Sequence, residues 1–136
     1  MITNFEIVEN YALSYEGRHI DLHNNFDFRG FRHDITRKLL TLSWVKTEGS
    51  WVNEKEFDKI ELVHQGVSFL SINSETGISI EDKTLNCLGY FPSNERHIND
   101  SITNQNKPQK EDDIIYLFEN EAFIRINCLE IKILCR

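Results

Sequence analysis

The sequence predicts a mainly β fold of the α+β kind, an antiparallel curled sheet or open barrel of meandering hairpins with one or two short helices. Two observations support this class. Apolar and polar residues alternate with a period of two along most of the chain, which is the pattern of half-buried strands. Short turn signals such as Glu16-Gly17 and Gln65-Gly66 separate the alternating segments, as they do in hairpins.

In the first half of the chain, residues 11–15 and 18–23 flank Glu16-Gly17 and are expected to form a tight hairpin. Asn24-Asn25 has two interpretations. The first is a second turn, because Asn tolerates positive φ. The second is a position inside a longer strand, because the alternation continues through it. Leu39–Lys46 is the next strand, with Leu40, Leu42 and Trp44 on one face.

In the second half, two further hairpins are expected, one across Gln65-Gly66 from 59–64 to 67–72 and one across 119–121 from 114–118 to 122–127. Residues 129–134 form a last strand. A short helix is expected to begin at Ser79, an N-cap residue, and to stop at Gly89. A single helical turn is expected at 53–57, and the polar connection 92–112 is long enough to be functional or disordered.

The length of 136 residues fits one domain over 1–136 that needs no disulfide or metal to fold. Cys87, Cys128 and Cys135 form no CxxC pair, and an odd number of cysteines fits reduced thiols. The first residues, MITNFEIVEN, resemble no signal peptide, and no apolar run is long enough for a membrane span. We therefore expect a soluble cytoplasmic protein that contacts no membrane.

The net charge is −7 and the isoelectric point is near 5.2. Binding to a nucleic-acid backbone requires a positive surface, so this charge argues against a nucleic-acid partner. The same charge favours electrostatic steering toward a basic protein.

One row of side chains invites a metal interpretation. His19, Asp21 and His23 share one face of a predicted strand, but His19 and His23 would lie about 13 Å apart along it. Zinc requires nitrogen ligands at about 2.0–2.1 Å, so two His side chains this far apart on one flat strand can barely meet at one ion. The row is therefore interpreted as the solvated face of the strand, and no metal or cofactor is expected. The alternative is a metal-dependent site that His33, His64 or His97 completes from other strands.

The segment 29–38, RGFRHDITRK, concentrates positive charge in an acidic chain. Arg29, Arg32 and Arg37 alternate with Phe28 and Phe31, a composition found in single-stranded nucleic-acid and phosphate platforms. These arginines are the candidate site for a small ligand or nucleotide. The alternative is a strand and turn whose arginines pair with the surplus carboxylates.

The residues do not favour an enzyme. No GxSxG motif occurs. A nucleophilic cysteine needs a base beside it in space, but Cys87 is expected to be a core side chain, and Cys128 and Cys135 are expected to lie in or beside the last strand. Pairs of carboxylates such as Glu54 with Glu56 are common in any acidic chain, so they carry little weight as acid-base catalysts.

A protein-binding surface is the stronger candidate. Residues 51–58, WVNEKEFD, place Trp51 among Glu54, Glu56 and Asp58, and Trp is a favoured interface anchor. The alternative is that Trp51 closes one end of the core and the acids are merely solvated. A second acidic edge is formed by Glu111, Asp112 and Asp113.

Three stretches also carry a resemblance: 57–72 (FDKIELVHQGVSFLSI), 82–100 (DKTLNCLGYFPSNERHIND) and 112–134 (DDIIYLFENEAFIRINCLEIKIL). Together they resemble a group of small bacterial proteins, some of which are similar to immunity proteins of polymorphic and contact-dependent toxin systems. The shared features are Gly66-Val67-Ser68-Phe69 in a hairpin turn and Leu88-Gly89-Tyr90 at a helix end. The closing hairpin departs from the pattern, since 119–121 replaces the expected glycine turn.

The resemblance implies a small, cytosolic, cofactor-free protein that neutralises a toxin by covering its active surface. Many such toxins are basic nucleases, which agrees with the acidic charge. We therefore expect a non-enzymatic protein-binding domain whose partner is a basic toxin domain or another basic protein. The alternative is a small-ligand or nucleotide-binding β domain that uses the 29–38 run. The sequence leaves the oligomeric state open.

Overall fold

A computed structural model describes residues 1–73 and 83–136 of the protein. The mainly β class predicted from the sequence is confirmed, and the sheets are open and not closed into a barrel. One short 3-10 turn, η1 (Ser93–Glu95), is the helical element of these ranges. The strands are β1 (Ile2–Thr3), β2 (Glu6–Val8), β3 (Ala12–Tyr15), β4 (Arg18–Asp21), β5 (Phe26–Asp34), β6 (Leu39–Lys46), β7 (Lys59–Gln65), β8 (Phe69–Asn73), β9 (Leu85–Pro92), β10 (Asp112–Phe118), β11 (Phe123–Asn127) and β12 (Glu130–Cys135).

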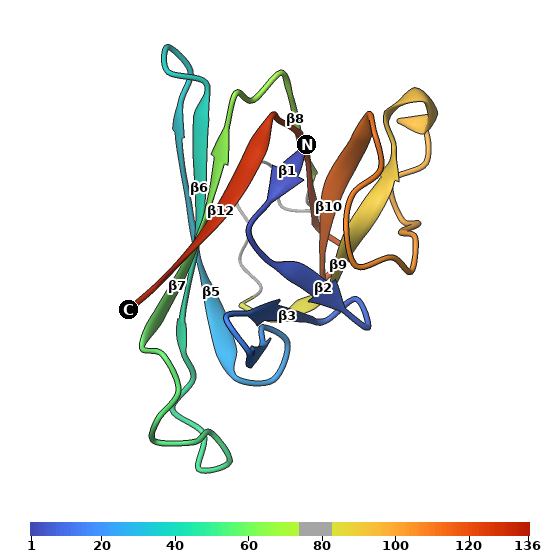
Figure 1. Ribbon diagram of the computed structural model, residues 1–136. Coiled ribbons are helices and arrows are strands. Elements are labelled where there is room, and N and C mark those ends of the chain that lie inside the picture. The colour runs from blue at the N-terminus through green and yellow to red at the C-terminus, as the bar shows by residue number, and fades with distance from the viewer. Residues whose placement is uncertain (74–82) are drawn as a thin grey trace.

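The strands form three sheets (Figure 1). A five-stranded sheet has the order β1-β12-β7-β6-β5, and a four-stranded sheet has the order β8-β11-β10-β9. The third sheet, β2-β3-β4, lies across the lower end of the space between the other two. All strand pairs are antiparallel except β1 with β12.

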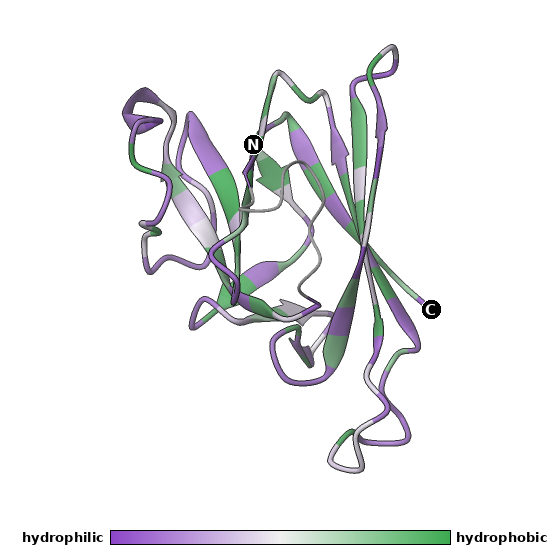
Figure 2. Ribbon diagram, turned by 180° about the vertical axis from the view of Figure 1, so that it is seen from behind, coloured by the Kyte–Doolittle hydropathy of each residue, from purple (hydrophilic) through white to green (hydrophobic). Residues whose placement is uncertain are grey.

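The core lies between the two larger sheets. Hydrophobic and hydrophilic residues alternate along their strands (Figure 2), so each sheet turns one apolar face inward. Aromatic rings join the sheets: the centroids of Phe28 and Phe118 lie 4.8 Å apart, and those of Trp44 and Tyr116 lie 6.0 Å apart. Aromatic pairs of this kind stabilise a core beyond simple burial.

Several local predictions are confirmed. Glu16 and Gly17, with φ of 49° and 78°, form the turn between β3 and β4. Asn24-Asn25 is a turn, in which Asp21 accepts hydrogen bonds from both the backbone and the side-chain nitrogen of Asn24. The hairpin across 119–121 is the β10–β11 pair.

The hairpin predicted across Gln65-Gly66 is wrong. A turn does occur there, but β7 pairs with β6 and β12, whereas β8 pairs with β11 in the other sheet. The chain therefore crosses from one sheet to the other at Gly66, which has a φ of 69°.

The helix predicted to end at Gly89 is also wrong where the structure describes it, and its start, 79–82, lies outside the described residues. Leu85 and Leu88 belong to β9, and both are buried in the core. Leu117 of β10 pairs with Cys87 and Phe118 pairs with Leu85, so Asn86 is an extra residue in β9, and this bulge allows Leu85 and Leu88 to face inward although they are three residues apart. This bulge reproduces the spacing of a helical face. Residues 53–57 likewise form turns without a helix.

Substituting Gly66 tests the crossing between sheets. In Gly66→Ala, Cβ would lie 2.7 Å from both Cγ and Cδ1 of Leu129, in a left-handed backbone conformation. We expect a loss of about 2 kcal/mol in the free energy of unfolding, measured with urea. Gly17→Ala is the control, because φ is also positive but nothing lies within 4 Å of its Cβ. Equal losses in the two variants would contradict a role for the Leu129 contact.

Candidate functional site

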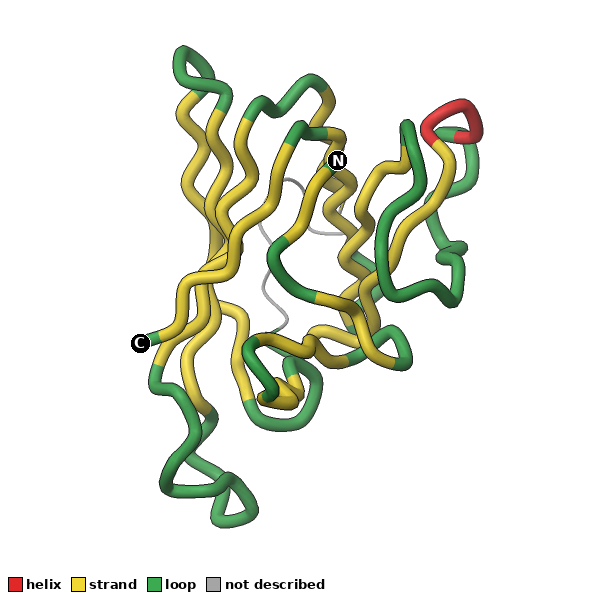
Figure 3. Tube along the Cα trace, viewed as in Figure 1, coloured by secondary structure: helices red, strands yellow, loops and turns green. Residues whose placement is uncertain are grey.

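The loop 47–58 joins β6 to β7 and extends beyond one end of the five-stranded sheet (Figure 3). Trp51 lies on this loop with 68% of its surface exposed. Its indole Nε1 donates a 3.0 Å hydrogen bond to the backbone oxygen of Asn24. Its ring covers Gly49 so closely that a Cβ there would overlap the ring. Trp51 is therefore held in one position although it is exposed, and it does not close the core.

Arg18 of β4 fixes the other side of this loop. Its guanidinium donates to the backbone oxygen of Lys55 at 3.1 Å and pairs with Glu56 at 3.5 Å. The same group lies 3.9 Å from the ring centroid of Phe57. Such a contact between a guanidinium and an aromatic face is attractive. A strand of a different sheet therefore holds the loop in shape.

The charges of the loop are divided between structural and free groups. Glu56 is used by Arg18, and Asp58 pairs with Lys46 at 3.2 Å although its side chain is 85% exposed. Glu48 and Glu54 are exposed and form no ion pair with any described residue. These two carboxylates flank Trp51 in the sequence and are free to meet a partner.

The second acidic edge predicted from the sequence is wrong in two of its three residues. Glu111 is exposed, but Asp112 and Asp113 are buried. Asp112 Oδ2 accepts hydrogen bonds from the backbone of Gln109 and from the side chain of Gln105, both at 2.8 Å. These carboxylates are satisfied inside the protein, so they do not form a contact surface.

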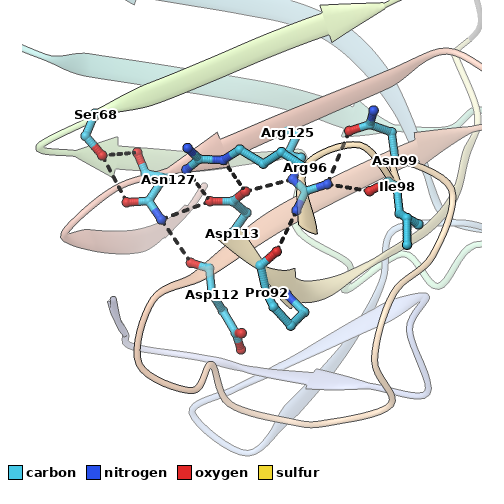
Figure 4. A network of polar contacts seen from close by, with 9 residues as sticks. All are labelled: Ser68, Pro92, Arg96, Ile98, Asn99, Asp112, Asp113, Arg125 and Asn127. Carbon is cyan, nitrogen blue, oxygen red and sulfur yellow. Dashed lines mark hydrogen bonds and ion pairs between the residues drawn. The ribbon is translucent and has the colours of Figure 1, made fainter. Parts of the chain in front are cut away.

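Asp113 is the centre of a buried polar network (Figure 4). It receives Arg125 Nε at 2.7 Å, Arg96 Nε and a second Arg96 nitrogen at 2.9 Å each, and Asn127 Nδ2 at 2.9 Å. Burial by itself raises the pKa of this carboxyl group, but the hydrogen bonds from Arg96, Asn127 and Arg125 outweigh it and hold the pKa below its usual value. Asp113 is therefore ionised and fully paired.

Arg125 also anchors the loop 93–111 to the outer face of the four-stranded sheet. Its side chain is fully buried and donates to the backbone oxygens of Pro92 and Ile98 at 2.9 and 2.5 Å. Arg96 lies 3.7 Å from the ring centroid of Phe69 and closes the network on the solvent side. The long polar connection is thus held in place by buried hydrogen bonds.

Arg125 is not among the residues predicted from the sequence. A signal was present, because Arg125 lies opposite Ile115 in the predicted hairpin, and Asp113 is two residues from Ile115 on the same face. Diagonal neighbours on one face lie within reach of a long side chain. The sequence does not show that the loop 93–111 would cover this pair and remove it from water.

The arginines of the 29–38 run do not share a carboxylate partner. Arg32 of β5 reaches Glu61 of β7 at 3.2 Å, whereas Arg37 pairs with Asp34 in the turn at 3.8 Å. Arg29 is exposed at a bulge of β5. These pairs follow the interpretation of the run as a strand and turn, and binding of a small ligand or nucleotide stays a prediction.

The His19-Asp21-His23 row has structural contacts. His23 Nδ1 lies 2.6 Å from the backbone oxygen of Leu85, and the ring of His19 packs edge-on to that of Tyr11. Asp21 caps the turn at Asn24. Within 1–73 and 83–136, no group of three or more His, Cys, Asp or Glu residues is placed to hold a metal ion.

No helix in the described ranges has the length and hydrophobicity to cross a membrane. Comparisons with models of known families, with curated proteins and with solved structures find no match to this chain.

Proposed function

We propose that this protein is a non-enzymatic binding domain that acts in the cytoplasm and captures a basic protein through the loop 47–58. A toxin domain whose active surface would be covered is the partner that fits best, as for an immunity protein. The observation that supports this proposal most directly is Trp51, which is two-thirds exposed yet fixed by Asn24 and Gly49.

The position of Trp51 is unusual energetically. Leaving an indole in water forgoes burial that stabilises most tryptophans in folded proteins. Tryptophan is also enriched among the few residues that dominate binding energy at interfaces. Because the loop is already ordered by Arg18, binding would lose little conformational entropy. An anchor held in its bound conformation is therefore available to a partner.

The free carboxylates of Glu48 and Glu54 favour a basic partner over an acidic one. Acidic groups at the rim of a contact speed the approach of a basic partner and reject acidic ones. The overall charge of −7 acts in the same direction. The partner is therefore expected to be captured faster at low salt than at moderate salt.

The first test removes the anchor. The tagged protein is used to capture proteins from a lysate of its source cell at 50 and 200 mM NaCl, and the captured basic protein is then titrated. Trp51→Ala is expected to weaken its binding at least about 30-fold, since hot-spot residues contribute 2 kcal/mol or more. Ile2→Ala is the matched control, because Ile2 is also 68% exposed but lies in β1. A captured partner that binds Trp51→Ala as tightly as the native protein would contradict the proposal.

Two further variants separate the contribution of the Trp51 ring position from that of the nearby carboxylates. Gly49→Ala keeps Trp51 but displaces its ring, so it is expected to weaken binding about tenfold through loss of preorganisation. Glu48→Lys with Glu54→Lys is expected to slow association and to remove its salt dependence. Both variants leave the ion pair of Arg18 with Glu56 intact. Unchanged association in the charge variant would show that steering comes from elsewhere on the surface.

A further inference from the structure

Strand β5 is the outermost strand of the five-stranded sheet, with β6 on one side. On its other side, the backbone bond formed within the described ranges is that from Phe28 N to Lys83 O, at 2.7 Å. Residues 31–34 are all exposed. The distal half of β5 therefore presents a strand edge to water, and such an edge can pair with another extended chain.

This edge is preformed. Pairing of β5 with β6 continues to Asp34 opposite Leu39, so the hairpin is regular up to its turn (Figure 1). The backbone nitrogen of Val67 donates to the oxygen of Lys38 at 2.9 Å and supports the β6 side of the turn. An incoming segment would thus meet a strand that is already extended.

The side chains along the edge differ between its two faces. Arg32 lies opposite Thr41, reaches Glu61 on the outer face, and has a side chain that is 75% exposed. Phe31 and Ile35 are two of the exposed large hydrophobic residues of the protein, at 37% and 78%. Successive residues of a strand point to opposite faces, so Arg32 shares the outer face with Asp34, and Phe31 shares the other face with His33.

The hairpin formed by 27–38 carries more cations than acids, since Arg29, Arg32, Arg37 and Lys38 stand against Asp27 and Asp34. Asp34 pairs with Arg37 at 3.8 Å, and Arg32 pairs with Glu61 at 3.2 Å. Arg29 is exposed and has no ion pair with any residue in the described ranges. Positive charge therefore dominates this edge in a protein whose net charge is −7.

We propose that the distal edge of β5 binds an extended acidic segment of a partner protein, which adds to the sheet as a sixth strand. Backbone hydrogen bonds supply affinity in this mode, and alternate side chains supply specificity. The segment matches the edge when acidic residues alternate with apolar ones, so that carboxylates meet Arg29 and Arg32 while apolar groups cover Phe31 and Ile35.

A second copy of this chain is a poorer match. Pairing β5 with its own copy would bring together two hairpins that each carry Arg29, Arg32, Arg37 and Lys38 against only Asp27 and Asp34. Like charges placed opposite each other destabilise a strand pair. Charged side chains at an edge also prevent uncontrolled strand pairing. The charge of the edge thus selects an acidic partner over self-association.

The test uses a fluorescein-labelled ten-residue peptide that alternates glutamate and valine, measured by fluorescence anisotropy at 50 mM NaCl. We expect saturable binding that is at least about tenfold weaker when lysine replaces glutamate in the peptide. Arg29→Glu is expected to weaken binding about tenfold. Lys110→Glu changes the net charge equally at another exposed site and should leave binding unchanged.

Two peptides methylated on alternate backbone nitrogens separate strand addition from simple charge attraction. A strand bonds to an edge through every second residue, so one of the two peptides should fail to bind. Binding of both with full affinity, equal binding of the lysine peptide, or no binding of the parent peptide would each overturn the proposal. So would a dimer, detected by sedimentation, that the peptide fails to dissociate.

Discussion

Replacing Arg125 with methionine is expected to lower the free energy of unfolding by about 3–5 kcal/mol, because Asp113 loses the fully buried one of its two arginine partners. Asp113 would keep Arg96 and Asn127 but lose its shortest hydrogen bond, that of 2.7 Å from Arg125. The carbonyl groups of Pro92 and Ile98 would lose their donor as well. Denaturation with guanidinium chloride measures the loss. The same substitution should accelerate hydrogen exchange in the loop 93–111, since Arg125 anchors that loop.

Arg96→Met is the matched control for this prediction. Arg96 binds the same carboxylate through two nitrogens at 2.9 Å, but its side chain is 36% exposed. Water can take its place beside Asp113, so the expected loss is smaller, about 1–2 kcal/mol. Equal losses for the two variants would mean that burial does not distinguish the two arginines. A loss below about 1 kcal/mol for Arg125→Met would contradict the role given to the buried pair.

The elements predicted correctly are those specified by neighbouring residues. Leu40, Leu42 and Trp44 alternate with Thr41 and Ser43, only Val45 breaks the polar side, and β6 has the predicted bounds Leu39–Lys46. The β3–β4 hairpin follows from Glu16-Gly17, which supplies the positive φ that a two-residue turn requires. In each case the turn residues and the alternation lie within a few positions of each other.

The failures come from pairings between distant segments. Gln65-Gly66 is a turn, but β12 occupies the edge of β7 that the predicted hairpin partner would take. The spacing of Leu85 and Leu88 is that of a helix, and only the bulge between them, at Asn86, explains how they both face inward from a strand. Neither cause is visible in the local sequence.

In the candidate site, residue types and charges were predictable from the sequence, whereas burial and fixed positions were not. Trp51 and Glu54 stand out by residue type and composition, and both are exposed. That Trp51 is fixed depends on Asn24, which is 27 residues away, and on the close approach of Gly49. The run 111–113 has the composition of an acidic surface, yet Asp113 is buried because Arg125 pairs with it. Composition indicates charge, whereas burial depends on tertiary contacts.

Acidification is expected to destabilise the protein through His64, which is fully buried in the core. Its Nδ1 lies 3.0 Å from the oxygen of Leu40, which can only accept, so Nδ1 carries the proton. Nε2 then accepts from the hydroxyl of Tyr116 at 2.8 Å. Burial lowers the pKa of His64 to about 4, although hydrogen bonds to the backbone of Leu40 and Leu62 act in the opposite direction. The neutral imidazole is therefore the form that the core accommodates.

The direction of the pH effect follows from this lowered pKa. In the unfolded chain His64 takes up a proton near pH 6.5, whereas in the folded protein it does so only near pH 4. Between these values the unfolded state binds more protons, so stability falls as the pH falls. The loss is expected to reach about 2 kcal/mol at pH 5 and about 3 kcal/mol near pH 4, since one pKa unit corresponds to about 1.4 kcal/mol.

Urea denaturation of a double variant, His64→Leu with Tyr116→Phe, isolates this contribution. The variant removes the titrating ring together with the hydroxyl that would lose its acceptor, and both replacements are apolar in an apolar core. Relative to the native protein, it should lose about 2 kcal/mol less stability between pH 7.5 and pH 5. His33→Gln removes an exposed histidine instead and should keep the native pH dependence. Parallel stability curves for the native protein and the double variant would show that His64 takes up its proton equally in the folded and unfolded states.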